Sequence, residues 1–366
     1  MHRIASHARK TTQHNIGRRR PKRSDRARRV TTLVLALVAL LGLTPSAGAV
    51  ETAPTCHRYD LPVSVHAGSP TDQRIAGWLC AIGPTTGKTV QLLVHGFTLD
   101  HTYWDPSYQP NRYSYVQAMT RAGYATFTID RLGAGASSHP PAAELTVENH
   151  AWTVHQTTQA LRAGTIGGTR FSKVVLVGHS LGSAVAQTEA SRYQDVDALI
   201  LSGWMHTPLW LGTPGVILTA LPAQLDPRFP NLPLGYVAPL PHAHKNLLVD
   251  TNNADTTLLA LDEQHAQTGS LAEEVTVVPT ILPPLTQHIT APVLLATGQN
   301  DSIFCGPLTP CPNAATVRTR EAPMFTSTPR FDTFVLPDAG HMMNVQRNAP
   351  AFFSASLRWL NSISAP

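Results

Sequence analysis

Short apolar runs and segments of helix-forming composition alternate along the chain after residue 89. The apolar runs are rich in β-branched and aliphatic residues, which is typical of strands buried inside a sheet. The expected strands are 90–95, 125–130, 174–177, 198–204, 292–298 and 333–336, and the expected helices are 114–122, 147–163, 181–193 and 349–361. This alternation predicts an α/β fold in which a mostly parallel sheet carries helices on both faces.

Two stretches depart from this pattern. Residues 61–83 predict two short strands, 63–66 and 77–82, with Gly and Pro turns after each. Residues 205–290 hold eleven prolines, only nine charged residues and no clean strand–helix unit. Because structureless loops of that length are uncommon in compact domains, we expect an inserted cap that lines the substrate site. A structural elaboration at the sheet edge is the alternative.

We call residues 205–290 the cap segment. It divides the predicted core into residues 50–204 and 291–366.

The positive charge of the chain is concentrated at its N-terminus. Residues 1–30 carry eleven of the 28 Lys and Arg residues, and the rest of the chain carries 17 basic and 22 acidic residues, a net charge of −5. An uncharged apolar run to Leu43 and Ala-Gly-Ala at 47–49 follow the basic residues. This order predicts a secretory signal peptide over 1–49, hence a secreted protein that keeps no stable membrane anchor after cleavage.

Export by the Sec or the twin-arginine route stays open, because Arg28-Arg29 precede the apolar run. Since the basic residues belong to the leader, the charge of the chain gives no support to nucleic-acid binding.

Four cysteines follow the leader: Cys56, Cys80, Cys305 and Cys311. An even number in an exported protein favours disulfides, and the local pairs Cys56–Cys80 and Cys305–Cys311 are the favoured ones among three possible pairings. Free buried thiols are the alternative. The spacing fits no zinc site, and no metal is expected.

The motif Gly178-His179-Ser180-Leu181-Gly182 connects the expected strand 174–177 to the following helix. A tight strand-to-helix turn needs glycines on both sides of its central residue, and it projects the serine hydroxyl above the sheet edge. The N-terminal N–H groups of the helix favour negative charge at the same place. The motif therefore predicts that Ser180 is a nucleophile.

This segment resembles the α/β-hydrolase superfamily, in which serine, acid and histidine follow in that order at the carboxyl ends of strands. The resemblance implies Asp301, in Gly-Gln-Asn-Asp after strand 292–298, as the acid, and His341, in Asp-Ala-Gly-His after strand 333–336, as the base. Asp332 and Asp338 are nearby rivals for the role of the acid.

An oxyanion hole is the further requirement of this chemistry. The resemblance implies the backbone N–H groups of Leu181, directly after the serine, and of Phe97, in His-Gly-Phe after strand 90–95. His95 and His179 are expected to orient neighbouring groups of the site or to pack against them. The loop Asp130–Ser137 is expected to brace the site wall, since Pro140-Pro141 exclude the helix that a dinucleotide motif needs.

Together these residues predict a secreted, esterase- or lipase-like serine hydrolase without a cofactor. It would cleave a carboxylic ester or lactone of an apolar small molecule through an acyl-enzyme. An amidase or peptidase on the same scaffold, with cap acids such as Asp250, Asp255, Glu273 and Glu274 binding a terminal charge, is one alternative. A non-catalytic secreted binding protein is the other.

Overall fold

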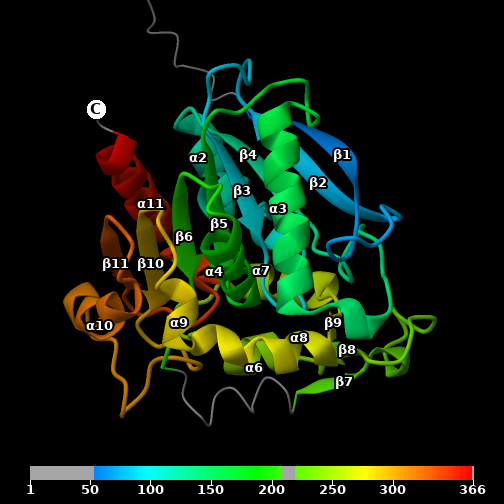
Figure 1. The fold of residues 1–366 in the computed structure, drawn as a ribbon. Helices are drawn as coiled ribbons and strands as arrows, with labels where there is room; N and C mark the ends of the chain where they lie inside the picture. The colour runs from blue at the N-terminus through cyan, green and yellow to red at the C-terminus, as the bar shows by residue number, and fades with distance from the viewer. Residues whose placement is uncertain (1–52, 208–218, 365–366) are drawn as a thin grey trace, which may run out of the picture. The chain divides into compact units, whose positions relative to one another are not determined.

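Eight strands form the central sheet, in the order β1-β2-β4-β3-β5-β6-β10-β11 (Figure 1). The computed structural model describes residues 53–207 and 219–364, so the predicted leader lies outside the described residues. The strands are β1 Thr55–Val63, β2 Gln73–Ala81, β3 Val90–Val94, β4 Ala125–Ile129, β5 Val174–His179, β6 Ala198–Ser202, β10 Val293–Gly298 and β11 Phe331–Leu336. From β4 to β11 all neighbours pair in parallel, which confirms the predicted α/β architecture.

Helices cover both faces of this sheet. On β5, Val174 and Leu176 join a core cluster with residues of α3 (Val147–Ala163) and α4 (Leu181–Tyr193). The alternate residues Val175 and Val177 join a second cluster on the other face. The second cluster includes residues of α2 (Tyr115–Arg121) and α11 (Ala349–Ser364). Strands covered on both faces need continuous apolar runs, and this is why the sequence shows them.

The first strand lies earlier in the chain than predicted. We expected a strand at 63–66, whereas β1 spans Thr55–Val63 and pairs antiparallel with β2 over nine residues. Most of its residues from Thr55 to Asp60 are exposed, because β1 is an edge strand. It therefore lacks the apolar signal on which the prediction depended.

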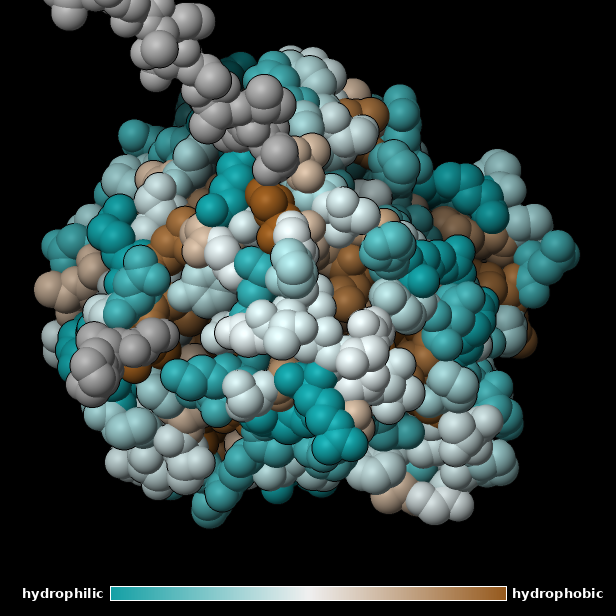
Figure 2. Space-filling model, turned by 90° about the horizontal axis from the view of Figure 1, so that it is seen from above, coloured by the Kyte–Doolittle hydropathy of each residue, from teal (hydrophilic) through white to brown (hydrophobic). Residues whose placement is uncertain are grey.

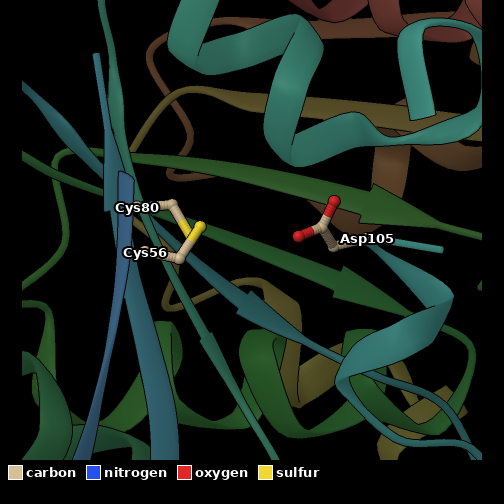
Figure 3. Close-up of side chains that lie close together, drawn as sticks. All are labelled: Cys56, Cys80 and Asp105. Carbon is tan, nitrogen blue, oxygen red and sulfur yellow. A yellow bond between two sulfur atoms is a disulfide. The ribbon is translucent and has the colours of Figure 1, made fainter. Parts of the chain in front are cut away.

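Both disulfides have the predicted pairing, Cys56–Cys80 and Cys305–Cys311. Cys56 and Cys80 lie directly opposite each other in the β1–β2 ladder. The Asp105 carboxyl group lies near their sulfur atoms (Figure 3). This cluster is a poor metal site, because metals bind thiolates and these sulfurs are joined to each other.

The described residues of the cap segment, 205–207 and 219–290, form a small antiparallel sheet and four α-helices. The strands are β7 Ala220–Pro222, β8 Tyr236–Pro239 and β9 Gly269–Ser270, and the helices are α6 Ala243–Leu247, α7 Thr256–His265, α8 Leu271–Thr276 and α9 Pro283–Thr286. In Figure 1 these elements lie at the lower end of the central sheet, and Figure 2 shows the opposite end, where hydrophobic residues are scattered among hydrophilic ones. Within the described ranges, seven of the eight exposed large hydrophobic side chains lie between Leu221 and Leu282.

The remaining elements are short. They are the helices α1 Pro110–Tyr113 and α10 Ala314–Glu321, and the 3₁₀ turns His101–Tyr103, Ala142–Glu144, Ala223–Leu225, Val278–Ile281, Ala322–Met324 and Met343–Val345. In the part of the chain that the structure describes, no helix has the length and apolarity required to cross a bilayer.

Candidate active site

Ser180 occupies the turn between β5 and α4 with a positive φ, a strained conformation for a residue that is not glycine (φ 53°, ψ −122°). A Cβ atom at Gly178 would lie 2.4 Å from the carbonyl oxygen of Gly182, and one at Gly182 would lie 2.3 Å from that of Val94. Both glycines are thus required by the close passage of backbone around the serine. The N–H of Ser180 donates to the carbonyl of Ser202 on β6 (2.8 Å), which fixes the turn to the sheet.

Asp301 follows β10 and is fully buried. Its Oδ1 accepts hydrogen bonds from the N–H groups of Ile303 (2.9 Å) and Phe304 (3.3 Å). Its Oδ2 lies 2.9 Å from Nδ1 of His341. The backbone donors fix one carboxylate oxygen, so the other is aimed at the imidazole.

The two rival carboxylates are engaged elsewhere. Asp338 is exposed, and Asp332 pairs with Arg330 (2.6 Å) and accepts from the indole of Trp359 (3.1 Å). Of the three acids, only Asp301 contacts His341.

His341 follows β11 and is almost fully buried. Because Nδ1 faces a carboxylate, we assign it the proton, and Nε2 is then free to accept one. Nε2 has no hydrogen-bond partner among the described residues, Ser180 included. His341 and Ser180 line the same cavity. Bonds between nucleophile and base are often long in the absence of substrate, so this geometry is compatible with base catalysis.

The N–H groups of Phe97 and Leu181 are the predicted oxyanion donors, and neither donates to any described residue. Leu181 is the first residue of α4, where the helix N-terminus favours negative charge. Phe97 follows Gly96, whose backbone passes the serine so closely that a Cβ would lie 3.1 Å from Cβ of Ser180.

The peptide group that carries the Phe97 N–H is held by two buried side chains. Nε2 of His95 accepts from the N–H of Arg131 (2.9 Å), so its Nδ1 carries the proton and donates to the carbonyl of Gly96 (2.9 Å). Burial and the charge of Arg131 lower the pKa of His95 to about 3, which keeps this ring neutral. Arg131 Nη2 donates to the same carbonyl (3.0 Å). These two donors orient and polarise the Gly96–Phe97 peptide group.

Arg131 also connects this loop to the cap segment. Its Nη1 forms a buried ion pair with Glu273 at the start of α8, and His150 on α3 lies 2.8 Å from the same carboxylate. Burial opposes ionisation of Glu273, but the charge of Arg131 and the contact with His150 outweigh it and lower the pKa of Glu273 to about 2. No local pattern predicts this pair, because its members are 142 residues apart in the sequence.

The depressed pKa of Glu273 predicts a loss of stability in acid. The ionised carboxylate contributes stability above its ordinary pKa of 4.5, and this contribution is lost as the pH falls to about 2. We expect the free energy of unfolding to fall by about 3 kcal/mol over this range through this group alone. Urea denaturation between pH 2 and 7 measures it. The Glu273→Gln variant should be less stable at pH 7 and show a correspondingly flatter decline; a decline equal to that of the wild type would contradict the assignment.

His179 is buried beside the site as a neutral residue. Burial and the nearby His341 hold the pKa of His179 well below its usual range. Its ring stacks on Tyr103, with ring centroids 4.3 Å apart. It therefore packs, as expected, and does not provide a second base.

The His-x-His of the cap segment does not form a metal pair. The side chain of His242 is 67% exposed beside Glu263, whereas that of His244 is buried and lines the cavity with Ser180 and His341. His244 and its partner Asp262 lie at the cavity although the sequence did not predict them there. The His-x-His pattern was the one local signal for His244, and nothing local indicated Asp262.

Core loops and the cap segment both line the cavity. The cap segment contributes mainly apolar residues to its wall, among them Pro239, Ala243, Leu247 and Leu248.

The Cys305–Cys311 disulfide closes the loop that follows Asp301. The N–H of Cys305 donates to the carbonyl of Asp301 (2.7 Å), so the bridge holds the chain that carries the acid. Closure of so short a loop stabilises the fold by only about 2–3 kcal/mol. We expect the double variant Cys305→Ser/Cys311→Ser to lose more in kcat than in melting temperature, with KM little changed, because small displacements of a catalytic group are costly to rate. Steady-state kinetics and calorimetry measure both, and an unchanged kcat would contradict this coupling.

Comparisons with known proteins place the fold. A sequence model of the alpha/beta hydrolase family matches residues 91–355. No curated protein matches the chain. Similar solved structures include a thermophilic esterase from Thermogutta terrifontis (18% identity, 84% of this chain and 100% of that chain, TM-score 0.56). A second is a soluble variant of monoglyceride lipase from Saccharomyces cerevisiae (15% identity, 86% of this chain and 97% of that chain, TM-score 0.55). A third is the enol-lactonase from Burkholderia xenovorans LB400 (15% identity, 79% of this chain and 97% of that chain, TM-score 0.52).

Proposed function

The chain belongs to the alpha/beta hydrolase family, and we propose on this basis that it is a serine hydrolase that cleaves carboxylic esters or lactones through an acyl-enzyme. The observation that carries the proposal is the hydrogen bond between Asp301 and His341 beside a cavity that His341 shares with Ser180. The unpaired N–H groups of Phe97 and Leu181 beside the serine support it.

In this mechanism Ser180 Oγ attacks the ester carbonyl carbon while His341 Nε2 accepts the hydroxyl proton. The negative charge that develops on the carbonyl oxygen is stabilised by the two N–H donors and by the N-terminus of α4. The C–O bond of the ester then breaks, and His341 returns its proton to the departing alcohol. Water, deprotonated by the same imidazole, attacks the acyl-enzyme and releases the carboxylic acid, which restores Ser180.

An apolar substrate fits the surroundings of the serine best. The cap segment lines the cavity with mainly aliphatic side chains and exposes further hydrophobic side chains at its surface. The similar structures named above are those of an esterase, a monoglyceride lipase and an enol-lactonase, which supports an ester or lactone as substrate.

The acids of the cap segment give the peptidase alternative no support. Glu273 is paired with Arg131, Asp255 caps the N-terminus of α7, and Asp250 accepts from the side chain of Asn300 (2.7 Å). None of these three side chains, nor that of Glu274, lines the cavity with Ser180. A substrate amine would therefore find no carboxylate among the described residues that line the cavity.

We also propose that the mature protein is exported and acts outside the cell. Two disulfides support an oxidising compartment, because cytosolic thiols are normally kept reduced.

Labelling with a fluorophosphonate probe tests the proposed function. The folded protein should be modified at Ser180, as peptide mass spectrometry will show, and should hydrolyse p-nitrophenyl butyrate much faster than aminoacyl anilides. Failure of the probe to react would favour the non-catalytic binding protein, and faster cleavage of the anilides would favour the peptidase.

A further inference from the structure

A second histidine–carboxylate pair faces the cavity from the cap segment. Nδ1 of His244, on α6, lies 2.8 Å from Oδ2 of Asp262, on α7, and the two side chains are only 5% and 11% exposed. His244 lines the cavity together with Ser180 and His341. The proposed catalytic steps give this pair no part.

The other nitrogen of His244 contacts the residue that follows Phe97. Its Nε2 lies 2.8 Å from Oγ1 of Thr98, and this hydroxyl in turn donates to the carbonyl of Phe97 (2.7 Å). A hydroxyl group has one proton to donate, so Nε2 must carry a proton itself to complete the first contact. Nδ1 carries one as well, because it faces a carboxylate. The geometry therefore makes His244 an imidazolium.

Charged neighbours support this protonation state. Burial opposes it, but the carboxylate of Asp262, aided by Glu263 on α7, outweighs burial and raises the pKa of His244 above its usual range. Arg228 acts in the opposite sense, and His179 on β5 also faces the group.

Thr98 has a backbone conformation that needs support. Its φ of 55° lies in the left-handed region, which is a genuine outlier for a β-branched residue and is strained. Three hydrogen bonds hold it: its own hydroxyl to Phe97, the bond from His244, and the N–H of Gln267 to its carbonyl (2.8 Å). Two of the three come from the cap segment.

The cap segment also packs directly on Phe97. A Cβ at Gly269 on β9 would lie 2.0 Å from the ring of Phe97, so the strand backbone rests against this side chain. The residue with the proposed oxyanion donor is thus held by the core through Arg131 and by the cap segment through Thr98 and Gly269.

We propose that His244, oriented by Asp262, is a positioning residue that holds Thr98 and thereby fixes the Phe97 N–H in the geometry that the oxyanion requires. The inference rests on the proposed function. Its consequence is that the oxyanion hole is complete only when the cap segment packs against the core.

The proposal predicts a pH dependence. Loss of the Nε2 proton of His244 turns this nitrogen into an acceptor for the Thr98 hydroxyl, which then releases the Phe97 carbonyl. Turnover therefore falls as the pH rises through the raised pKa of His244.

A double-mutant cycle with p-nitrophenyl butyrate tests the role of His244. His244→Gln should lower kcat about 10- to 100-fold with KM changed less than about threefold, and should remove the alkaline limb of the pH profile. Glycine adopts positive φ without strain, so in a Thr98→Gly background the same substitution should change kcat less than about twofold. His242→Asn, an exposed neighbour at positive φ, is the control and should behave as the wild type. Asp262→Asn, which keeps the shape of the carboxylate, should reproduce the effect of His244→Gln if that variant does not fold.

Equal effects of His244→Gln in both backgrounds, an unchanged alkaline limb, or an effect on KM alone would overturn the proposal. A measurement independent of turnover is the nitrogen NMR spectrum of the imidazole, which should show both nitrogens of His244 protonated on the acid side of the alkaline limb; one unprotonated nitrogen there would also overturn it. Absence of any turnover that depends on Ser180 would instead remove the proposed function, and this role with it, whatever the NMR spectrum shows.

Discussion

Replacement of Ser180 by alanine is expected to abolish hydrolysis of p-nitrophenyl butyrate, with kcat lower by about three to six orders of magnitude. The variant loses the oxygen that forms the acyl-enzyme, so only the oxyanion donors and substrate binding can still act. The fold should be unaffected, because the hydroxyl makes no hydrogen bond to any described residue and the turn is held by backbone contacts. Stopped assays give kcat, and circular dichroism with thermal melting reports the fold.

The control for this prediction is Ser172→Ala. Ser172 is exposed just before β5, so the same chemical change there should leave both turnover and melting temperature unaltered. Turnover of the Ser180→Ala protein within tenfold of the wild type would show that another group performs the chemistry.

Local sequence patterns were sufficient to predict the strands that carry the candidate catalytic residues. The strands β5 and β10, which precede Ser180 and Asp301, are buried along their length and leave apolar runs in the sequence. The strand β11, which precedes His341, is a partly exposed edge strand, and only its last residues, 334–336, form such a run. The parallel order of the strands then brings their carboxyl ends to one edge of the sheet. The bond between Asp301 and His341 joins residues 40 positions apart through this arrangement alone.

The contacts that complete the site could not be predicted in this way. His244 meets Thr98 across 146 positions, and nothing local to either residue indicates the other. In the loop Asp130–Ser137, the carboxylate of Asp130 accepts from the N–H groups of Ala136 (2.8 Å) and His101 (2.8 Å), and the role of this loop as a brace of the site wall stays a prediction. The further contact of Arg131 with the Gly96 carbonyl depends on how two loops pack together. The spacing of apolar residues along the chain gives no information about such packing.

The pair of Asp301 and His341 leads to the second large effect. In an Asp301→Asn variant, the N–H groups of Ile303 and Phe304 require an acceptor, so the amide oxygen should take the place of Oδ1. The amide NH₂ group then faces Nδ1 of His341, which must accept, and the ring proton moves to Nε2. An imidazole in this tautomer cannot take the proton of Ser180.

We therefore expect Asp301→Asn to lower kcat by about four orders of magnitude with the fold retained, since the substitution preserves size and shape. Asp338→Asn provides the matched control: it makes the same chemical change three residues before His341, but on an exposed side chain that does not contact the imidazole, and it should retain wild-type kcat. Steady-state kinetics on both variants decides the matter. More than a tenth of wild-type kcat in Asp301→Asn, or an equal loss in Asp338→Asn, would show that the acid has been misassigned.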